Sequence, residues 1–142
     1  MQQNFDLRGF LPYLLNLAAE EAGLGFQALY KSRYGMLRTE WRVLFHLGQS
    51  GEITASEICT RARLHKTKVS RAVAALGARR FVQRLPAPHD RRAEVLRLTD
   101  AGRAAFVDLR ARAAVYDASL LAGFTSDEAA ALRRDLSRLA KL

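Results

Sequence analysis

Residues 54–98 read TASEICTRARLHKTKVSRAVAALGARRFVQRLPAPHDRRAEVLRL, and this stretch decides the fold. It opens with a capping box, in which the Thr54 side chain accepts from the amide three residues on and Glu57 reaches back. A short helix follows, and Arg63-Leu64-His65 forms a turn. A second helix then runs from about Lys66 to Arg79, with apolar residues at helical spacing. Two helices joined by so short a turn are typical of a helix-turn-helix.

Two segments of period two follow the second helix. Phe81 to Leu85 and Glu94 to Leu98 each predict a short strand, and residues 86–93 between them predict a polar hairpin loop with two prolines. A helix-turn-helix followed by a basic hairpin is a winged helix-turn-helix. The predicted fold class is therefore mainly α with a small β-hairpin wing (α+β).

The flanking segments predict further helices. Before the helix-turn-helix, helices are expected from about Leu7 to Lys31, with Pro12 in the first turn, and from Thr39 to Gly48. After the wing, Thr99 caps a long helix to about Ala122, and a second capping box, Thr125 to Glu128, opens the last one. We expect one compact chain with three regions: an N-terminal dimerisation helix (1–35), a winged helix-turn-helix DNA-binding region (36–99) and C-terminal dimerisation helices (100–142).

Apolar stripes near the two chain ends predict dimerisation. Phe106, Leu109, Ala113, Tyr116 and Leu120 are spaced 3, 4, 3, 4, as in a coiled-coil seam, and the last helix repeats this pattern. A small winged domain offers these stripes no obvious partner, so a homodimer is expected. The alternative is that the stripes pack only on each other.

The net charge of the chain is confined to residues 61–97. This segment holds 11 Lys or Arg and 2 acids, a balance of +9 that equals the net charge of all 142 residues. The remainder, with 12 cations and 12 acids, is neutral. Positive charge concentrated in one segment indicates a polyanionic partner, and nucleic acid is the commonest one. The alternative is a solvated basic face on an ordinary helical bundle.

The position of each cation in the predicted elements indicates which part of the DNA it contacts. Thr67, Lys68 and Arg71 lie on the outward face of the second helix of the pair, which fits the major groove of duplex DNA. Arg63 and Lys66 at its start suit phosphates. Asp90-Arg91-Arg92 at the hairpin tip is placed to reach a minor groove, and we assign Arg84 of the first strand to the same DNA-contacting set.

The chain resembles the MarR (multiple antibiotic resistance regulator) family of winged-helix transcription factors. The resemblance rests on EWRVLFHLG (40–48), ITASEICTRARLHKTKVSRAVAAL (53–76) and FVQRLPAPHDRRAEVLRLTDAG (81–102). It implies an obligate homodimer with a ligand crevice between its dimerisation and DNA-binding parts. It also implies that Asp90 orients Arg92 by an ion pair, with Arg91 beside it. The helix residues that it places against bases or backbone are Lys66, Thr67, Lys68, Ser70 and Arg71.

The chain departs from the family pattern at two helix ends. Arg80 stands where the family usually has a glycine just before the wing, so the helix is expected to end differently, or Arg80 to add a phosphate contact. Leu37 stands where a capping residue is usual, so Thr39 is expected to cap that helix instead.

A ligand site is predicted on the helix that follows residue 38. Arg42 and His46 share one helix face near Trp41, and with Tyr34 and Arg38 they suit a small aromatic or phenolic effector bearing a carboxylate. The alternative is a solvated or DNA-facing stripe.

Other chemistry is not indicated. The three histidines lack metal-ligand spacing, and Cys59, the single cysteine, is expected in the core, so no metal or cofactor is predicted. No phosphate loop or nucleophile motif indicates an enzyme. No apolar run is long enough for a membrane span, and the expected location is cytoplasmic.

The function predicted from the sequence is a sequence-specific, double-stranded-DNA-binding transcriptional regulator. We expect a ligand-responsive repressor that acts as a homodimer on a pseudo-palindromic operator. The alternative functions are non-specific binding of DNA or RNA, and a ligand-binding or enzymatic helical dimer.

Overall fold

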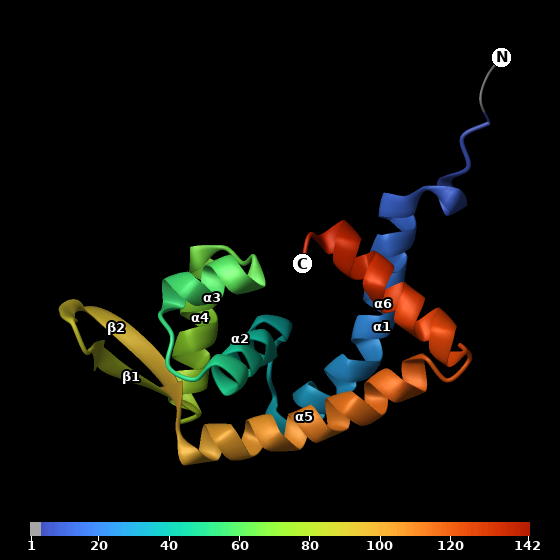
Figure 1. Cartoon of the computed structure of the whole chain (residues 1–142). Helices are drawn as coiled ribbons and strands as arrows, with labels where there is room; N and C mark the ends of the chain where they lie inside the picture. The colour runs from blue at the N-terminus through green and yellow to red at the C-terminus, as the bar shows by residue number, and fades with distance from the viewer. Residues whose placement is uncertain (1–3) are drawn as a thin grey trace.

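The structure, a computed structural model, describes residues 4–142, so the first three residues of the predicted N-terminal region lie outside the described part. Six α-helices and a two-stranded antiparallel hairpin make up this part of the chain (Figure 1). The predicted fold class is thereby confirmed. In chain order the elements are a 3₁₀ turn (Leu7–Gly9), α1 (Leu11–Tyr34), α2 (Arg38–Ser50), α3 (Ala55–Ala62), α4 (Lys66–Ala78), β1 (Val82–Ala87), β2 (Asp90–Leu98), α5 (Asp100–Leu120) and α6 (Ser126–Ala140).

Helix α5 runs along the base of the molecule and connects its two halves (Figure 1). The wing, α3 and α4 lie toward the end at which α5 begins, and α1 and α6 lie toward the end at which it finishes. Helix α2 packs on α4, α3 and α5, while α1 packs along α5. Among residues 4–142, no helix combines the length and the apolar composition needed to cross a bilayer.

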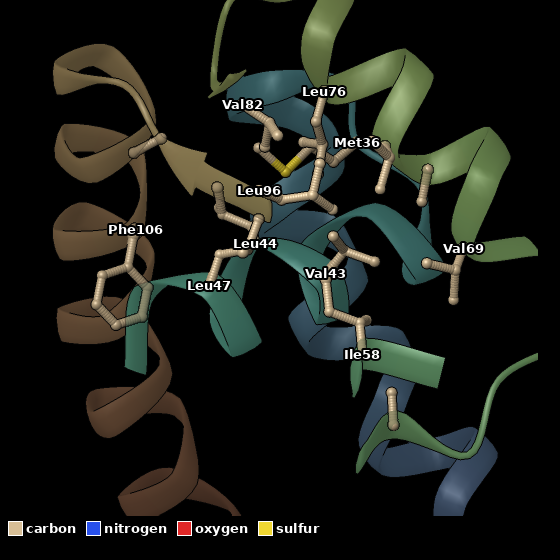
Figure 2. Packing of buried hydrophobic residues seen from close by; sticks show 14 of the residues in the cluster. Met36, Val43, Leu44, Leu47, Ile58, Val69, Leu76, Val82, Leu96 and Phe106 are labelled. Atoms are coloured by element: carbon tan, nitrogen blue, oxygen red, sulfur yellow. The ribbon is translucent and has the colours of Figure 1, made fainter. Parts of the chain in front are cut away.

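The hydrophobic core is formed where α2, α3, α4, the wing and α5 meet. Val43, Leu44 and Leu47 of α2 are fully buried at its centre. Figure 2 shows side chains from the surrounding elements pointing toward them, including Ile58, Val69, Leu76, Val82, Leu96 and Phe106. Phe106 packs against Gly48, where an added Cβ would lie 2.5 Å from ring atoms. This core fixes the orientation of α4 and of the wing.

Side-chain caps begin the helices at three of the predicted places. Thr54 accepts from the Glu57 amide at 3.1 Å, and Thr125 accepts from the Glu128 amide at 3.1 Å, which confirms both capping boxes. Thr99 accepts from the Gly102 amide at 3.0 Å at the start of α5. Local hydrogen bonds of this kind depend on neighbouring residues alone, which is why the sequence predicts them.

The wing joins α5 through a tight corner. Thr99 is the only residue between β2 and α5, and its hydroxyl donates to the Arg80 carbonyl at 2.6 Å. Gly102 lies against the Phe81 carbonyl, where an added Cβ would come within 2.0 Å of the oxygen. The start of β1, the end of β2 and the first turn of α5 are thus held together.

The start of α2 differs from the prediction. The helix begins at Arg38 rather than Thr39, and Leu37 is its N-cap although its side chain cannot accept a hydrogen bond. Glu40 instead turns back and accepts from the Leu37 amide at 2.5 Å. Glu40 is buried at 3% exposure and faces Arg79. The expected cap by Thr39 was wrong because a tertiary contact holds Glu40 in this position.

The wing also differs from the prediction, because its strands are longer and its loop is shorter. β1 continues through Pro86, which pairs with Glu94, and an irregularity follows before Ala87 pairs with Asp90. Only Pro88 and His89 remain in the turn. Proline is tolerated here because each strand of a two-stranded ribbon has an outer edge, where the missing N–H is not needed.

Helix α4 ends with Arg80 in the left-handed conformation at φ 60°. The Phe81 amide donates to the Leu76 carbonyl and the Arg80 amide to the Gly77 carbonyl, both at 2.9 Å. This is the Schellman pattern usually closed by glycine. The helix therefore ends in the family's usual way, with an arginine in the glycine's place.

The predicted apolar stripe of α5 is divided between two environments. Phe106 and Leu109 are buried in this chain's own core, and Tyr116 donates to the Ala22 carbonyl of α1 at 2.5 Å. Helix α5 ends at Leu120, two residues before the predicted end at about Ala122, and Leu120 is 43% exposed. The apolar surface exposed on the α1, α5 and α6 half includes Leu11, Leu14, Leu17, Leu120, Phe124, Leu132, Leu136 and Leu139.

Candidate nucleic-acid interface

Helix α4 presents one buried and one exposed face. Val69, Ala72, Val73 and Leu76 are buried against the core. The rest of the helix surface is exposed and carries all five predicted contact residues: Lys66, Thr67, Lys68, Ser70 and Arg71. Because side chains three and four positions apart share a helix face, Thr67, Ser70 and Arg71 form one stripe and Lys68 lies beside it.

His65 is the N-cap of α4. Its Nδ1 accepts from the Thr67 amide at 3.2 Å. The sequence pattern predicts His65 in the turn and does not indicate this capping role. Its position immediately before the helix is the signal that identifies it, although Ser, Thr, Asp and Asn are the usual capping residues.

Five of the eleven cations in residues 61–97 are engaged within the chain. Arg84 pairs with Glu94 across the wing at 3.3 Å, and Arg97 pairs with Glu52 at 3.4 Å. Arg61 donates to Ser50, and Arg63 donates to the Ala140 carbonyl of α6, both at 2.6 Å. Arg79 donates to the Gly35 carbonyl at 2.7 Å and also contacts the Tyr34 carbonyl, so it holds the corner between α1 and α2.

The other six cations of this segment contact no acidic side chain within residues 4–142. All are exposed, and they lie on α4, at its C-terminal turn and on the wing. They are Lys66, Lys68, Arg71, Arg80, Arg91 and Arg92. Within residues 61–97, the cations without an internal partner thus lie on or next to the two elements that a winged helix-turn-helix uses on DNA.

The wing tip corrects one expectation from the family resemblance. Asp90 does not pair with the Arg92 guanidinium in the described part of the chain. Its Oδ1 accepts from the Arg92 backbone amide at 2.9 Å, two residues away. Asp90 therefore shapes the backbone at the start of β2 and leaves the guanidinium groups of Arg91 and Arg92 exposed.

The residues predicted to bind a ligand make their contacts with different elements of the fold. Tyr34 donates to Asp108 of α5 at 2.6 Å. Arg42 donates to the Ala62 carbonyl at the end of α3 at 2.7 Å, and burial lowers its pKa. His46, one turn further, also has a lowered pKa, first through burial and then through the charges of Arg42 and Arg61. Arg38, at the start of α2, lies close enough for its charge to lower the pKa of Arg42 further.

Two neighbouring hollows adjoin α2 on the side of α1. One, of about 430 Å³, lies between α1 and α2 and includes Arg38, Glu20 and Gln27 in its lining. The other, of about 520 Å³, lies between α1, α2 and α5 and includes Phe45 and Tyr116. Phe26 and Trp41 line both, with ring centroids 5.1 Å apart in an edge-to-face arrangement. Phe26 and Phe45 are not among the ligand residues predicted from the sequence, although the spacing of Trp41 and Phe45 by one helical turn is a signal for Phe45.

These features define a winged helix-turn-helix protein of the DNA-binding class. A family model described as the MarR family matches residues 34–93. The MarR family transcriptional regulator SPO1453 from Silicibacter pomeroyi is 30% identical over 97% of this chain and 98% of that chain, with a TM-score of 0.83. The chain therefore belongs to the MarR family of transcriptional regulators. No curated protein sequence matches it significantly.

Other solved structures show the same fold. A probable transcriptional regulator from Pseudomonas aeruginosa is 26% identical over 94% of this chain and 99% of that chain, with a TM-score of 0.78. BpsR from Bordetella bronchiseptica has a TM-score of 0.86 over 97% of this chain and 98% of that chain, at 19% identity. Likeness at this lower identity concerns the fold alone.

Proposed function

We propose that this DNA-binding regulator is a homodimeric, ligand-responsive repressor that reads a pseudo-palindromic operator. The observation that carries the proposal is the distribution of unpaired cations over α4 and the wing. Helix α4 enters the major groove, where Arg71 and Lys68 are placed to reach base edges, while Thr67 and Ser70 supply hydroxyl groups. Lys66 contacts phosphate at the start of the helix, and Arg91 and Arg92 extend into the adjacent minor groove.

Arg84 is the least available of the proposed DNA contacts, since Glu94 pairs with it across the wing. Both side chains are more than half exposed, and an exposed ion pair contributes little free energy. A phosphate can therefore replace Glu94 as the partner of Arg84. Asp90 shapes the backbone at the wing tip through its bond to the Arg92 amide, and the Arg92 guanidinium remains available for DNA.

The dimer is supported by the apolar surface of the α1, α5 and α6 half. Leu14, Leu120 and Leu136 line a hollow of about 410 Å³ among these three helices, and all three are at least 40% exposed. Apolar surface of this extent marks an interaction site. A two-fold dimer then assigns residues 1–35 and 100–142 to dimerisation and residues 36–99 to DNA. In such a dimer the α4 helices of the two protomers, the recognition helices, lie about 10 base pairs apart on DNA.

The ligand response is supported by the two aromatic hollows beside α2. The published structure of BpsR concerns regulation of its DNA binding by 6-hydroxynicotinic acid. For this chain we propose a small aromatic acid, with its ring against Phe26 and Trp41 and its carboxylate toward Arg38. A ligand that binds better to the DNA-incompatible arrangement shifts the population toward it and releases DNA.

The test is selection of genomic fragments by the purified protein, followed by salt titration on a selected fragment and on random duplex DNA. We expect one enriched motif with two inverted half-sites and tighter binding to the selected fragment. Equal affinity for both would support non-specific nucleic-acid binding and overturn the operator. A stable monomer in sedimentation at micromolar concentration would overturn the dimer.

A further inference from the structure

Arg63 connects the turn before α4 to the far end of α6. Its Nη1 donates to the Ala140 carbonyl at 2.6 Å, and its Nη2 lies 3.5 Å from the Lys141 carbonyl. The contact spans 77 positions of sequence and bridges the two halves of the molecule. It therefore joins the helix that carries the DNA contacts to a helix of the proposed dimer.

The chemistry of a helix end explains why an arginine binds there. The last carbonyls of an α-helix lack intrahelical partners and carry partial negative charge. At the end of α6, the Lys141 amide donates to the Arg138 carbonyl at 3.2 Å and the Leu142 amide to the Ser137 carbonyl at 3.0 Å. Neither bond uses the Ala140 carbonyl, and the Arg63 guanidinium supplies its donor.

The backbone on both sides of the contact has an uncommon conformation. Arg63 lies in the left-handed region at φ 52°, and Lys141 lies there at φ 57°. Residues with a Cβ disfavour this region, and they persist in it when the surrounding structure determines the position. An arginine at position 63, where glycine suits the backbone better, indicates that its side chain has a use.

We propose that Arg63 is a positioning residue that fixes the recognition helix relative to the dimer. Its bond to α6, the Arg63–α6 contact, holds the α3–α4 turn against the dimerisation half, so each recognition helix keeps a set distance from its copy in the partner protomer. Arg63 is then occupied inside the protein rather than on a DNA phosphate. This inference rests on the proposed dimer.

Three variants separate the side chain from the backbone. Arg63→Gly removes the guanidinium, and glycine suits φ 52°, so the helix-turn-helix keeps its fold. Lys141→Pro cannot adopt φ 57° and displaces the two acceptor carbonyls without touching Arg63. Lys141→Gly is the matched control, because it removes the lysine side chain and retains the left-handed turn.

The first measurement is the distance between the helix-turn-helix units of the two protomers in the full-length dimer. A spin label is placed at Thr60→Cys, on the exposed side of α3, in a Cys59→Ser background. We expect a narrow distance distribution for this parent and for Lys141→Gly. Arg63→Gly and Lys141→Pro should broaden this distribution equally. The double variant should give a distribution no broader than that of either single variant.

Unchanged widths in Arg63→Gly and Lys141→Pro would overturn the positioning role while leaving the dimer intact. A complete lack of dipolar coupling in the parent would instead refute the dimer, and with it this inference.

The second measurement is the salt dependence of binding to random duplex DNA. Arg63→Gly should leave the slope of log affinity against log salt unchanged, because no phosphate contact is lost. A slope reduced by about one in Arg63→Gly, but not in Lys141→Pro, would show that Arg63 contacts phosphate. That result would overturn the proposal in favour of a direct DNA contact.

Discussion

The hydroxyl of Tyr34, in the last turn of α1, donates a hydrogen bond of 2.6 Å to the Asp108 carboxylate in the middle of α5. Arg33 and Arg112 donate to the same carboxylate at 2.9 and 3.1 Å. These bonds lower the pKa of Asp108 to about 2, with the Tyr34 hydroxyl as the largest cause. The network thus ties α1 to α5 on the outside of the aromatic core.

The first prediction concerns acid stability. Tyr34→Phe should raise the pKa of Asp108 toward its ordinary value, as measured by NMR titration of the carboxyl carbon. Because folding lowers this pKa, the stabilisation is complete above the ordinary value of 3.8 and is lost as the pH falls through about 2. Wild type should therefore exceed Tyr34→Phe in stability at pH 5 and lose that advantage near pH 2. Tyr13→Phe is the control, and equal titration of Asp108 in both variants would contradict the assignment.

The second prediction concerns His46 at mildly acidic pH. Burial and the charges of Arg42 and Arg61 lower its pKa from 6.5, so the fold favours the neutral imidazole. Its contribution to stability is present above pH 6.5 and is lost as the pH falls below that value. His46→Gln should reduce the loss of unfolding free energy between pH 8 and pH 5.5, measured by urea denaturation. If the variant retains the full wild-type loss, another group is responsible.

The third prediction compares two glycines inside helices. Gly48→Ala places a Cβ 2.5 Å from the ring of the buried Phe106, and such overpacking should destabilise the protein by about 1–3 kcal/mol. Gly77→Ala, near the end of α4, meets nothing within 4 Å and should stabilise it by about 0.5–1 kcal/mol through helix propensity. Urea midpoints measure both effects. Similar values for the two variants would show that the corner between α2 and α5 can repack.

The fourth prediction concerns Arg80, which combines an unfavourable backbone with an unpaired charge. Arg80→Gly should stabilise the protein by roughly 1 kcal/mol, because glycine adopts φ 60° without a steric penalty. The same change should weaken binding to random DNA and lower its salt slope by about one if Arg80 touches phosphate. Arg80→Lys, the control, should preserve both properties. A stabilised Arg80→Gly with an unchanged salt slope would restrict Arg80 to a backbone role.

The fifth prediction separates base contacts from phosphate contacts. Arg71→Ala should cost about 1–3 kcal/mol of affinity for the selected operator and relax specificity at one position. Arg91→Ala should weaken all sequences alike and reduce the salt slope by about one. Competition binding with operator and random duplexes distinguishes them. The reverse pattern would mean that the two roles are exchanged.

The elements predicted well from the sequence are those that depend on neighbouring residues. The capping boxes at Thr54 and Thr125 need only residues three positions apart, and the buried stripe of α4 follows from helical periodicity. The start of α2 was predicted wrongly because its cap depends on Glu40. Arg79, which faces Glu40, lies 39 positions further along the chain, so the contact exists only in the folded protein.

In the candidate site, too, the features set by neighbouring residues can be predicted and those set by tertiary contacts cannot. The exposed face of α4 can be assigned from spacing, but the availability of each cation cannot. Glu94 engages Arg84 through the register of the wing, and Glu52 engages Arg97 across 45 positions. The ligand residues were grouped by proximity along one helix. In the structure, Tyr34 turns toward α5 and Arg42 toward α3, and spacing along one helix does not reveal either contact.

Because the corner at Thr99 is tight, the wing moves together with α5. Its 21 residues extend about 30 Å at 1.5 Å per residue, from the wing at one end to the apolar half of the molecule at the other. Since Thr99 and Gly102 leave no slack between strand and helix, a tilt of α5 by a few degrees at Leu120 displaces the wing by ångströms. A small change in the helices around Leu120 thereby changes the position of the wing at the other end of α5.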